Sequence, residues 1–330
     1  MTARILDGKR VAAEIRQELA ARVEALRPSG VTPRISLIRV GEDPASVIYV
    51  RNKAKACAEV GIESEVLVLP AETADAAIAR AIEERSADPR VHGILLQLPL
   101  PGGRDPFDLL QKIDPCKDVD GFHPENVGRL CLGVDGFVPC TPLGIVELLR
   151  RHDIPLAGRH VAVIGRSATV GRPLANLLSR KEEGLNATVS MLHTASREPW
   201  EITSRADVVV AAAGRRALVD ARWIGEGAAV VDVGMHRGDD GKLYGDVDAA
   251  PVAEKAGWLS PVPGGVGPMT VACLLANTVL AAERFAGAAR FGGGGRGGRG
   301  EYGGYGGGRG GHGGQAGCGG RGDRAQGPGR

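Results

Sequence analysis

A tyrosine and a lysine one helical turn apart are the first residues of this 330-residue chain whose types and spacing could carry acid–base chemistry. Tyr49 and Lys53 lie in a segment that Asp43-Pro44 starts as a helix, so their side chains share one face. A lysine whose pKa is lowered by burial can pass a proton, and a tyrosine offers a stacking ring and a hydroxyl. Most pairs at this spacing are surface neighbours, so this pair needs support from other residues.

Gln97 and a short acidic segment give that support. Gln97 ends an otherwise apolar strand, expected over residues 91–98, where its amide needs a polar partner. Lys117-Asp118-Val119-Asp120-Gly121-Phe122 then places two carboxylates in a loop region. A carboxylate there can accept two N–H bonds from the amidine-like edge of a heterocycle. For Asp118 we favour the alternative, a turn-forming aspartate.

A glycine-rich loop indicates a nucleotide site further along the chain. Gly165-Arg166-Ser167-Ala168-Thr169-Val170-Gly171 follows the apolar run Val161-Ala162-Val163-Ile164 and precedes an apolar-periodic segment. In such a strand–loop–helix setting, backbone N–H groups and a helix N-terminus hold a phosphate. The loop departs from G-x-G-x-x-G, because Ser167 takes the middle position and Gly171 comes one residue late. A ligand-free turn therefore stays an alternative.

Two features of the same region favour NADP over NAD as the cofactor. In NAD-binding folds an acidic residue ends the second strand and accepts the ribose 2′-OH, but here that strand ends Leu192-His193-Thr194. Arg166 instead offers a fixed cation suited to a 2′-phosphate, unless it is only a solvated loop charge. Gly214 and Gly234 follow later strands, where each could let backbone pass close to the nicotinamide or could simply form a turn.

A second glycine-rich segment lies beyond the last of these strands. Pro263-Gly264-Gly265-Val266-Gly267-Pro268-Met269-Thr270 holds three glycines and two prolines and opens into a helix. A chain holds such a segment where backbone must approach a ligand or another domain closely. Together the two glycine-rich segments predict a nucleotide-dependent enzyme with a second ligand nearby.

The elements that position these residues predict an α/β protein. In the first half we expect helices over residues 11–26, 43–60 and 74–86, and strands over 34–40, 63–69 and 91–98. In the second half we expect strands over residues 159–164, 187–192, 207–211, 228–233 and 258–260, helices after Gly171 and around Trp200 and Trp223, and a terminal helix over 270–282. This alternation predicts parallel sheets with helical crossovers. The irregular stretch 99–142 follows a strand's carboxyl end, where α/β proteins bind ligands.

Composition separates a globular body from a tail. Residues 287–330 hold 23 glycines and seven arginines against Glu301 and Asp323, a net charge of +5 that leaves −3 for the rest. The body therefore has no basic bias towards nucleic acid, and the tail is predicted to be disordered. Its Arg-Gly-Gly repeats with Tyr302 and Tyr305 resemble RNA-binding tails, although we favour a flexible extension without a ligand.

The cysteines and the hydropathy of the sequence indicate the cellular compartment. The six cysteines form no C-x-x-C pair, so the sequence predicts neither a metal site nor a disulfide framework. We expect no secretory leader and no membrane span, and we interpret the protein as cytoplasmic.

Five of these motifs, in this order, closely resemble the bifunctional methylenetetrahydrofolate dehydrogenase/methenyltetrahydrofolate cyclohydrolase family over about residues 4–285. They are Tyr49-Val50-Arg51-Asn52-Lys53, residues 91–101, Lys117 to Phe122, Gly165-Arg166-Ser167 with Val170-Gly171, and Pro263 to Thr270. The resemblance implies two α/β domains that flank a cleft, the second a Rossmann-like NADP-binding domain. Residues 1–141 plus 266–286 would form the folate-binding catalytic domain with a returning last helix, 142–265 the NADP-binding domain, and 287–330 the tail.

The resemblance also implies roles for single residues. Lys53 would be the general acid/base, chiefly for hydrolysis, Tyr49 would stack on or border the folate, Gln97 would position Lys53, and Asp120 would anchor the pterin edge. The cofactor-binding residues would be Gly165, Arg166, Ser167, Gly171, Thr194, Gly214 and Met235. Pro263, Gly264 and Gly265 would line the cleft between the domains and border the substrate.

The implied activity is NADP-dependent oxidation of 5,10-methylenetetrahydrofolate to the methenyl form, followed by hydrolysis to 10-formyltetrahydrofolate. Family members are typically homodimers through the nucleotide domain, and their one-carbon products serve purine, methionine and histidine biosynthesis. Leu192-His193-Thr194-Ala195-Ser196 departs from the family's more usual Cys-His-Ser pattern, and the tail has no counterpart in the family.

Overall fold

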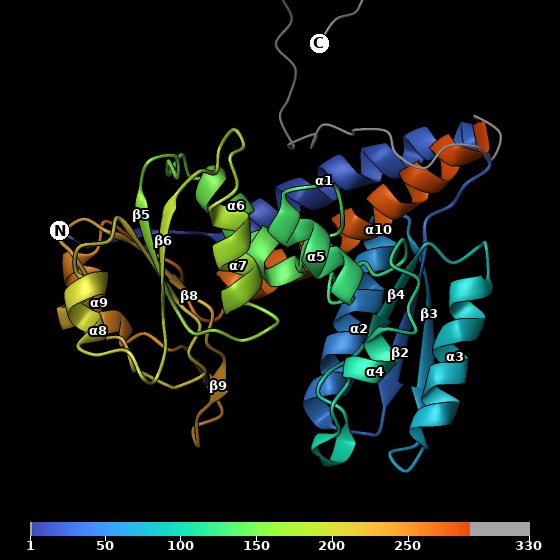
Figure 1. Cartoon of the computed structure of the whole chain (residues 1–330), viewed down its shortest axis with the longest axis horizontal. Helices are drawn as coiled ribbons and strands as arrows, with labels where there is room; N and C mark the ends of the chain where they lie inside the picture. The colour runs from blue at the N-terminus through green and yellow to red at the C-terminus, as the bar shows by residue number, and fades with distance from the viewer. Residues whose placement is uncertain (1, 291–330) are drawn as a thin grey trace, which may run out of the picture.

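The computed structural model describes residues 2–290, which form two parallel sheets with helices packed on them (Figure 1). One sheet has three strands in the order β3-β2-β4, and the other has six in the order β1-β11-β8-β7-β5-β6. A separate antiparallel hairpin pairs β10 with β9. The predicted α/β fold class with two parallel sheets is confirmed.

The strands are β1 (Arg4–Ile5), β2 (Arg34–Val40), β3 (Glu63–Leu69), β4 (Gly93–Leu96), β5 (His160–Ile164), β6 (Thr188–Leu192), β7 (Val208–Ala211), β8 (Ala229–Asp232), β9 (His236–Arg237), β10 (Leu243–Tyr244) and β11 (Trp258–Leu259). The helices are α1 (Gly8–Leu26), α2 (Pro44–Glu59), α3 (Asp75–Ala87), α4 (Phe107–Leu110), α5 (Pro124–Leu132), α6 (Cys140–Arg150), α7 (Gly171–Leu178), α8 (Pro199–Thr203), α9 (Ala249–Lys255) and α10 (Val266–Arg290). Short 3₁₀ turns are η1 (Arg27–Ser29), η2 (Pro101–Gly103) and η3 (Ala221–Trp223).

The three-stranded sheet forms because β2 is apolar and buried while β3 and β4 pair on its two sides. Ile35 is aligned with Ser64 on β3 and with Gly93 on β4, so all three strands run parallel and end at one edge. At that edge Asp43 caps α2, since its carboxylate accepts the N–H of Ser46 at 2.8 Å. The start that Asp43-Pro44 predicts for this helix is confirmed, and the helix carries Tyr49 and Lys53 past the strand ends.

The six-stranded sheet places its glycine loop in the same way. β5 is buried and lies between β6 and β7, with Ile164 aligned to Leu192 on one side and Ala211 on the other. The loops after these strands therefore share one edge, and α7 starts directly from the glycine loop. This is the arrangement that the strand–loop–helix pattern predicts.

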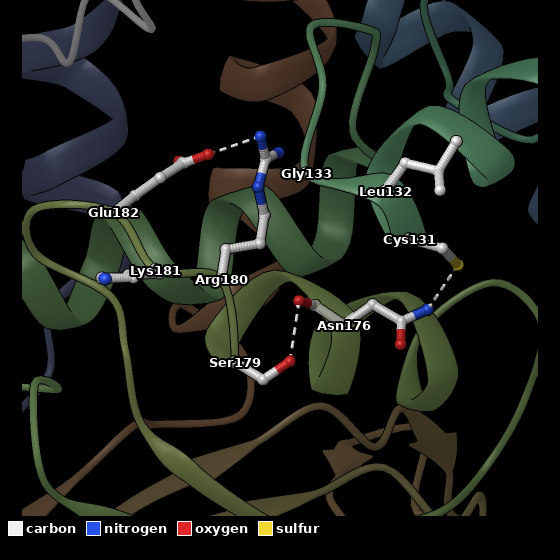
Figure 2. Close-up of a pocket in the computed structure, with 8 residues that line it drawn as sticks. All are labelled: Cys131, Leu132, Gly133, Asn176, Ser179, Arg180, Lys181 and Glu182. Carbon is white, nitrogen blue, oxygen red and sulfur yellow. Dashed lines mark hydrogen bonds and ion pairs between the residues drawn. The ribbon is translucent and has the colours of Figure 1, made fainter. Parts of the chain in front are cut away.

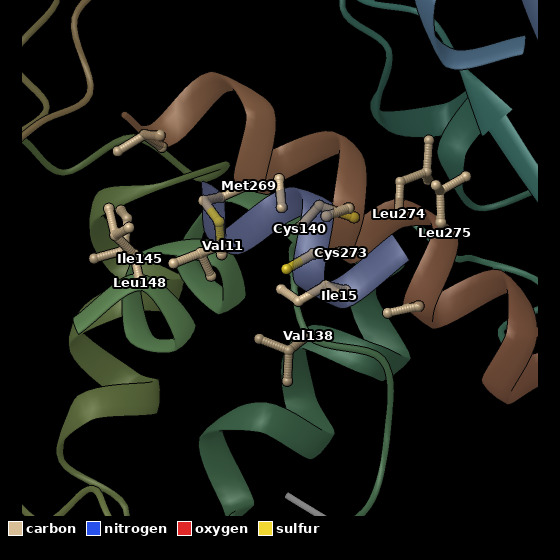
Figure 3. Close-up of a cluster of buried hydrophobic side chains, with 14 of the residues drawn as sticks. Val11, Ile15, Val138, Cys140, Ile145, Leu148, Met269, Cys273, Leu274 and Leu275 are labelled. Atoms are coloured by element: carbon tan, nitrogen blue, oxygen red, sulfur yellow. The ribbon is translucent and has the colours of Figure 1, made fainter. Parts of the chain in front are cut away.

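The last helix joins the two halves through a common core. α10 lies beside α1 and packs on α6 (Figure 1). Met269 and Cys273 on α10 are buried with Val11 and Ile15 on α1 and with Leu148 on α6 (Figure 3). By length and composition Val266–Gly287 could cross a membrane, but 67% of this stretch is buried inside the protein. Its apolar character is thus accounted for by the core.

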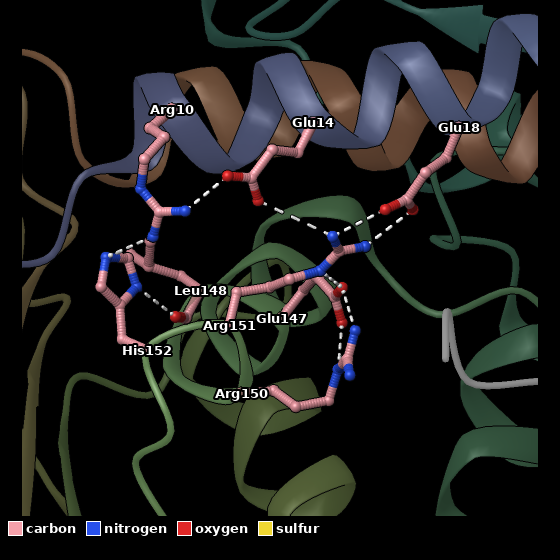
Figure 4. Close-up of polar contacts among 8 residues, drawn as sticks. All are labelled: Arg10, Glu14, Glu18, Glu147, Leu148, Arg150, Arg151 and His152. Atoms are coloured by element: carbon pink, nitrogen blue, oxygen red, sulfur yellow. Dashed lines mark hydrogen bonds and ion pairs between the residues drawn. The ribbon is translucent and has the colours of Figure 1, made fainter. Parts of the chain in front are cut away.

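A polar network reinforces the contact between α1 and α6 (Figure 4). The Arg151 guanidinium donates to both carboxylate oxygens of Glu18 at 2.7 Å and to Glu147 at 2.8 Å, and Arg150 donates to Glu147 as well. Burial would raise the pKa of Glu147, but hydrogen bonds from the two arginines outweigh it and lower that pKa. The buried carboxylate is thereby kept charged and paired.

The structure differs from the predictions at several boundaries. The predicted tail starts at residue 287, but α10 continues to Arg290, because Ala288 and Ala289 favour a helix that has already formed. The rest of the predicted tail lies outside the described residues. β1 pairs with β11 in the six-stranded sheet, whereas the predicted boundaries place it in the folate-binding domain. The domain boundaries as a whole stay a prediction.

Candidate functional site

Lys53 and Gln97 meet where α2 passes the carboxyl end of β4. Lys53 Nζ donates to Gln97 Oε1 at 3.0 Å, and Gln97 Nε2 donates to the Leu98 carbonyl at 2.6 Å. Both side chains are half-buried, so the amide is held at both ends while the ammonium group keeps other donor positions. Lys53 is therefore the polar partner that the amide at the end of an apolar strand requires.

Asp118 stabilises the loop that carries it. Its Oδ1 accepts the N–H groups of Gly121 at 3.1 Å and Phe122 at 3.3 Å, and its Oδ2 accepts from His123 N at 2.8 Å and Asn126 Nδ2 at 3.0 Å. Burial raises the pKa of Asp118, against the effect of these hydrogen bonds. The turn-forming interpretation of Asp118 agrees with these contacts, since both carboxylate oxygens are already occupied.

Asp120 lies close to Lys53. Burial raises the pKa of the Asp120 carboxyl, and the positive charge of Lys53 acts in the opposite direction. The Cys140 thiol at the start of α6 lies near Asp120 and donates its proton to the Val119 carbonyl at 3.3 Å. Sequence reasoning gave Cys140 no role, because a lone cysteine after a proline carries no recognisable pattern.

Tyr49 connects this cluster to the six-stranded half. Its hydroxyl lies 2.7 Å from Met235 Sδ, and Met235 follows β8 at the carboxyl edge of the other sheet. Both side chains are partly exposed, at 40% and 45%. A Cβ on Gly267, at the start of α10, would lie 3.8 Å from Met235 Cε. The carboxyl edges of the two sheets thus face one junction, with Tyr49 and Met235 on opposite sides.

The glycine loop after β5 is shaped by close backbone packing. Gly165 has φ 122°, and a Cβ there would lie 2.0 Å from the Ala212 carbonyl oxygen; a Cβ on Gly171 would lie 2.1 Å from the Gly165 carbonyl oxygen. Ser167 Oγ accepts the N–H groups of Val170 at 3.1 Å and Gly171 at 3.4 Å, which holds the loop directly before α7. Both glycines are therefore required by the fold, and Ser167 already has a structural role beside any role towards a phosphate.

Arg166 and Thr194 are exposed on neighbouring loops of the same edge. Gly165 N donates to the Leu192 carbonyl at 2.8 Å, which ties the end of β6 to the glycine loop. Within residues 2–290 Arg166 has no ion-pair partner, and no carboxylate ends β6. These features fit a phosphate on the ribose 2′ position better than a free 2′-OH.

Gly214 and Gly234, for which the sequence left two roles open, differ in structure. Gly214 has φ 67° and no atom within 4 Å of a Cβ added there, so its backbone conformation requires glycine. A Cβ on Gly234 would lie 2.4 Å from Asp246 Oδ1, so this glycine makes room for a carboxylate of the protein itself. Asp246 was not predicted as a functional residue.

The Pro-Gly-Gly segment packs against the start of α1. Lys9 N donates to the Gly264 carbonyl at 3.1 Å, and a Cβ on Gly8 would lie 1.8 Å from the Gly265 carbonyl oxygen. Gly264 and Gly265 are buried, while Pro263 is exposed. The close backbone approach that these glycines predict is therefore present between the Pro-Gly-Gly segment and α1.

A cavity of about 340 Å³ lies elsewhere, between the end of α5 and α7 (Figure 2). Its lining residues are Cys131, Leu132, Gly133, Asn176, Ser179, Arg180, Lys181 and Glu182. Asn176 Nδ2 donates to Cys131 Sγ at 3.0 Å, and Arg180 pairs with Glu182. None of the predicted site residues lines this cavity. Among residues 2–290 no cluster of His, Cys, Asp or Glu could hold a metal ion.

Comparison with known proteins matches two parts of the chain to two domain models of one family. Residues 6–120 match the family model described as the tetrahydrofolate dehydrogenase/cyclohydrolase catalytic domain, and residues 139–286 match its NAD(P)-binding domain. The chain is 52% identical over 281 residues to the bifunctional protein FolD 1 of Rubrobacter xylanophilus, which covers 85% of this chain and 98% of that protein. It is 53% identical over 276 residues to a bifunctional protein FolD of Desulfovibrio desulfuricans, covering 83% of this chain and 96% of the relative.

Solved structures agree with these relatives. The bifunctional methylenetetrahydrofolate dehydrogenase/cyclohydrolase of Campylobacter jejuni superposes with a TM-score of 0.82 at 44% identity, covering 86% of this chain and 99% of that one. A Trypanosoma brucei methylenetetrahydrofolate dehydrogenase-cyclohydrolase, solved with NADP and an inhibitor, gives a TM-score of 0.80 at 38% identity and covers 86% and 98%. The two family models together extend over both sheets and end at residue 286, before the glycine-rich tail.

Proposed function

Because this chain belongs to the tetrahydrofolate dehydrogenase/cyclohydrolase family, we propose that one site at the junction of its two sheets carries both reactions of that family. The protein is a bifunctional enzyme with NADP as cofactor. It oxidises 5,10-methylenetetrahydrofolate to 5,10-methenyltetrahydrofolate and hydrolyses this product to 10-formyltetrahydrofolate. The residue roles below are our proposals.

The hydrogen bond between Lys53 and Gln97 is the observation that carries the proposal. An amine that is half-buried, held at 3.0 Å by an amide and close to the Asp120 carboxyl has a fixed position on the junction. During hydrolysis, Lys53 takes a proton from the water that attacks the methenyl carbon and returns it to the ring nitrogen when the carbon–nitrogen bond breaks. Gln97 positions Lys53 for both transfers.

Tyr49 and Asp120 bind the folate on either side of Lys53. The Tyr49 ring is partly exposed at the junction and can stack on an aromatic ring of the substrate. Asp120, which lies close to Lys53 and Cys140, accepts N–H bonds from the pterin edge. Pro263, Gly264 and Gly265 line the far side of the cleft, where their backbone approaches the substrate.

The glycine loop and its neighbours bind the cofactor. The residues Gly165, Ser167 and Gly171 hold the diphosphate at the N-terminus of α7, Arg166 and Thr194 contact the 2′-phosphate, and Gly214 and Met235 border the nicotinamide. When bound, NADP⁺ supplies the hydride acceptor for the oxidation. The protein contributes orientation, because the junction places the folate between Lys53 and the loops after β7 and β8.

A coupled assay tests this function directly. Purified protein is mixed with 5,10-methylenetetrahydrofolate and NADP⁺, and NADPH formation is followed together with the absorbance of the methenyl product. We expect NADPH to form and the methenyl absorbance to rise and then decay faster than in buffer. Absence of NADPH formation would reject the dehydrogenase, and decay at the rate in buffer would reject the cyclohydrolase.

The assembly, compartment and pathway are further parts of this proposal. The exposed edge strand β6, with Met191 at 41% exposure, supports a homodimer through the NADP-binding domain, which sedimentation at several concentrations tests. We place the enzyme in the cytoplasm, where its products serve purine, methionine and histidine biosynthesis. Binding of single-stranded RNA by the arginine- and glycine-rich tail is a separate hypothesis from sequence, and we favour a flexible extension instead.

A further inference from the structure

Asp246, two residues after the end of β10, is a fully buried carboxylate with no part in the proposed chemistry. Its Oδ2 accepts the backbone N–H groups of Ala213 at 2.7 Å and Gly214 at 2.8 Å. Its Oδ1 lies 2.7 Å from His236 Nε2. One side chain therefore contacts two segments that lie far from each other in the sequence.

The first of these segments is the loop after β7. Besides the two bonds to the carboxylate, Ala217 N donates to the Gly245 carbonyl at 3.2 Å and Val219 N to the Asp246 carbonyl at 3.0 Å. The Arg216 guanidinium stacks 3.6 Å from the centre of the Tyr244 ring. Ala217 has φ 50°, a left-handed conformation that costs energy for a residue with a Cβ. Residues 244–246 therefore hold this loop in a backbone conformation that its own residues do not favour.

The second segment is the loop after β8. Asp232, the last residue of β8, accepts the N–H groups of Gly234 at 2.9 Å, Asp246 at 2.8 Å and Val247 at 3.0 Å. His236, which contacts Asp246, is next to Met235, the residue that reaches Tyr49. Asp246 therefore fixes the position of the Met235 side of the junction as well.

We propose that Asp246 is a positioning residue for the cofactor, because its carboxylate holds in place both loops that border the nicotinamide. This inference rests on the proposed function, in which Gly214 and Met235 flank that ring. Asp246 does not contact the substrate or the cofactor in this account. It sets the distance between the loop after β7 and the loop after β8, and it does so with charge-assisted hydrogen bonds in a buried setting.

The two activities of the enzyme make this role separable from a general loss of folding. Hydrolysis of 5,10-methenyltetrahydrofolate needs no NADP⁺, so the cyclohydrolase rate measured without cofactor does not depend on cofactor binding. For Asp246→Ala we expect the KM for NADP⁺ to rise about 10- to 100-fold, the range for losing hydrogen bonds to a charged group. The cyclohydrolase kcat/KM should stay within about twofold.

Asp246→Asn and Asp239→Ala complete the test. In the first variant the new amide oxygen can still accept from Ala213 and Gly214, but without the charge, so we expect its KM for NADP⁺ to rise only about 3- to 10-fold. Asp239 is an exposed carboxylate in the turn between β9 and β10, and its removal should leave the KM for NADP⁺ unchanged. If Asp246→Ala does not fold, the Asp246→Asn variant decides.

Two results would overturn the inference. One is a KM for NADP⁺ equal to wild type in the Asp246 variant that folds. The other is a parallel fall of both activities in that variant, which would make Asp246 a residue of general stability. Failure of the proposed function is distinct from both, because it would appear in the wild-type protein as absence of NADP⁺ reduction.

Discussion

The two sides of the junction are built in different ways. On the Lys53 side, side chains meet one another: Lys53 donates to Gln97 at 3.0 Å, and Asp120 lies close to Lys53 and Cys140. On the glycine-loop side, the contacts are mostly of backbone with backbone, and Arg166 is exposed without an ion-pair partner among the described residues.

This difference separates two kinds of site. The Lys53 side is organised before any ligand arrives, as expected where a proton must move between fixed groups. The glycine-loop side offers a shaped surface whose charged group gains its partner only when an anion binds. Substitutions on the first side should therefore change rates, and those on the second should change binding.

The largest effect is expected at Lys53. Lys53→Met should lower cyclohydrolase activity about 10²- to 10⁴-fold, the usual contribution of a general acid/base, while some dehydrogenase activity remains and methenyl product accumulates. Lys53→Arg should fail at hydrolysis too, because a guanidinium does not release its proton near neutral pH. Both rates are measured on the same preparations. Unimpaired hydrolysis in either variant would remove Lys53 from the mechanism and leave Asp120 as the candidate base.

A smaller, more selective effect is expected at Arg166. Arg166→Ala should weaken NADP⁺ about 10- to 100-fold and NAD⁺ much less, since only NADP⁺ carries a 2′-phosphate for the guanidinium to pair with. The ratio of KM values for the two cofactors is the measurement, with Arg172→Ala on α7 as a control for general loss of positive charge. Equal weakening of both cofactors would mean that Arg166 only shapes the loop.

Acid should lower the free energy of unfolding of the half that carries Lys53, because this half holds a buried histidine. Burial and the positive charge of Lys117 lower the pKa of His92, which lies just before β4 and accepts the N–H of Arg34. The unfolded chain binds this proton more readily, so the contribution of His92 to stability is full above its ordinary pKa of about 6.5 and falls as the pH drops through that value. Urea unfolding at pH 7.5 and 5.5 should show a smaller loss in His92→Asn than in wild type. An equal loss in both proteins would exclude His92 as the source.

The smallest effect is expected from the tail. A chain that ends at Arg290 should keep both activities, because the match to the NAD(P)-binding domain model ends at residue 286, before the glycine-rich segment. Rates of the shortened and full-length proteins are compared side by side. Loss of either activity would give the tail a role in catalysis, and salt-dependent RNA binding by the full-length protein alone would support the nucleic-acid hypothesis.

Much of this arrangement could be predicted from the sequence, because it depends on local pattern. The limits of β2 and β3 follow from apolar runs bounded by turn residues, and the start of α2 follows from Asp43 and Pro44. That Gln97 has a polar partner could be anticipated because an amide at the end of a buried strand needs one, whereas the family resemblance implied that this partner is Lys53.

Other features depend on contacts that no local pattern reveals. β1 has two residues and exists only because it pairs with β11 more than 250 positions away. Asp246 lies in a segment that reads as an ordinary turn, and its importance comes from N–H groups over thirty residues earlier. The roles of Gly214 and Gly234 could be separated only by what surrounds each one.

The pairing of β1 with β11 and the return of α10 to α1 have a consequence for synthesis on the ribosome. The edge strand β1 of the six-stranded sheet lies at residues 4–5, and its partner β11 lies at residues 258–259. In the same way α1 packs against α10, which begins at residue 266. Neither half can be completed until nearly all of the body has left the exit tunnel, so the usual order, in which an N-terminal domain folds first, does not apply. At about 5–20 residues per second, β2 and β4 remain without the contacts that α10 makes to them for many seconds.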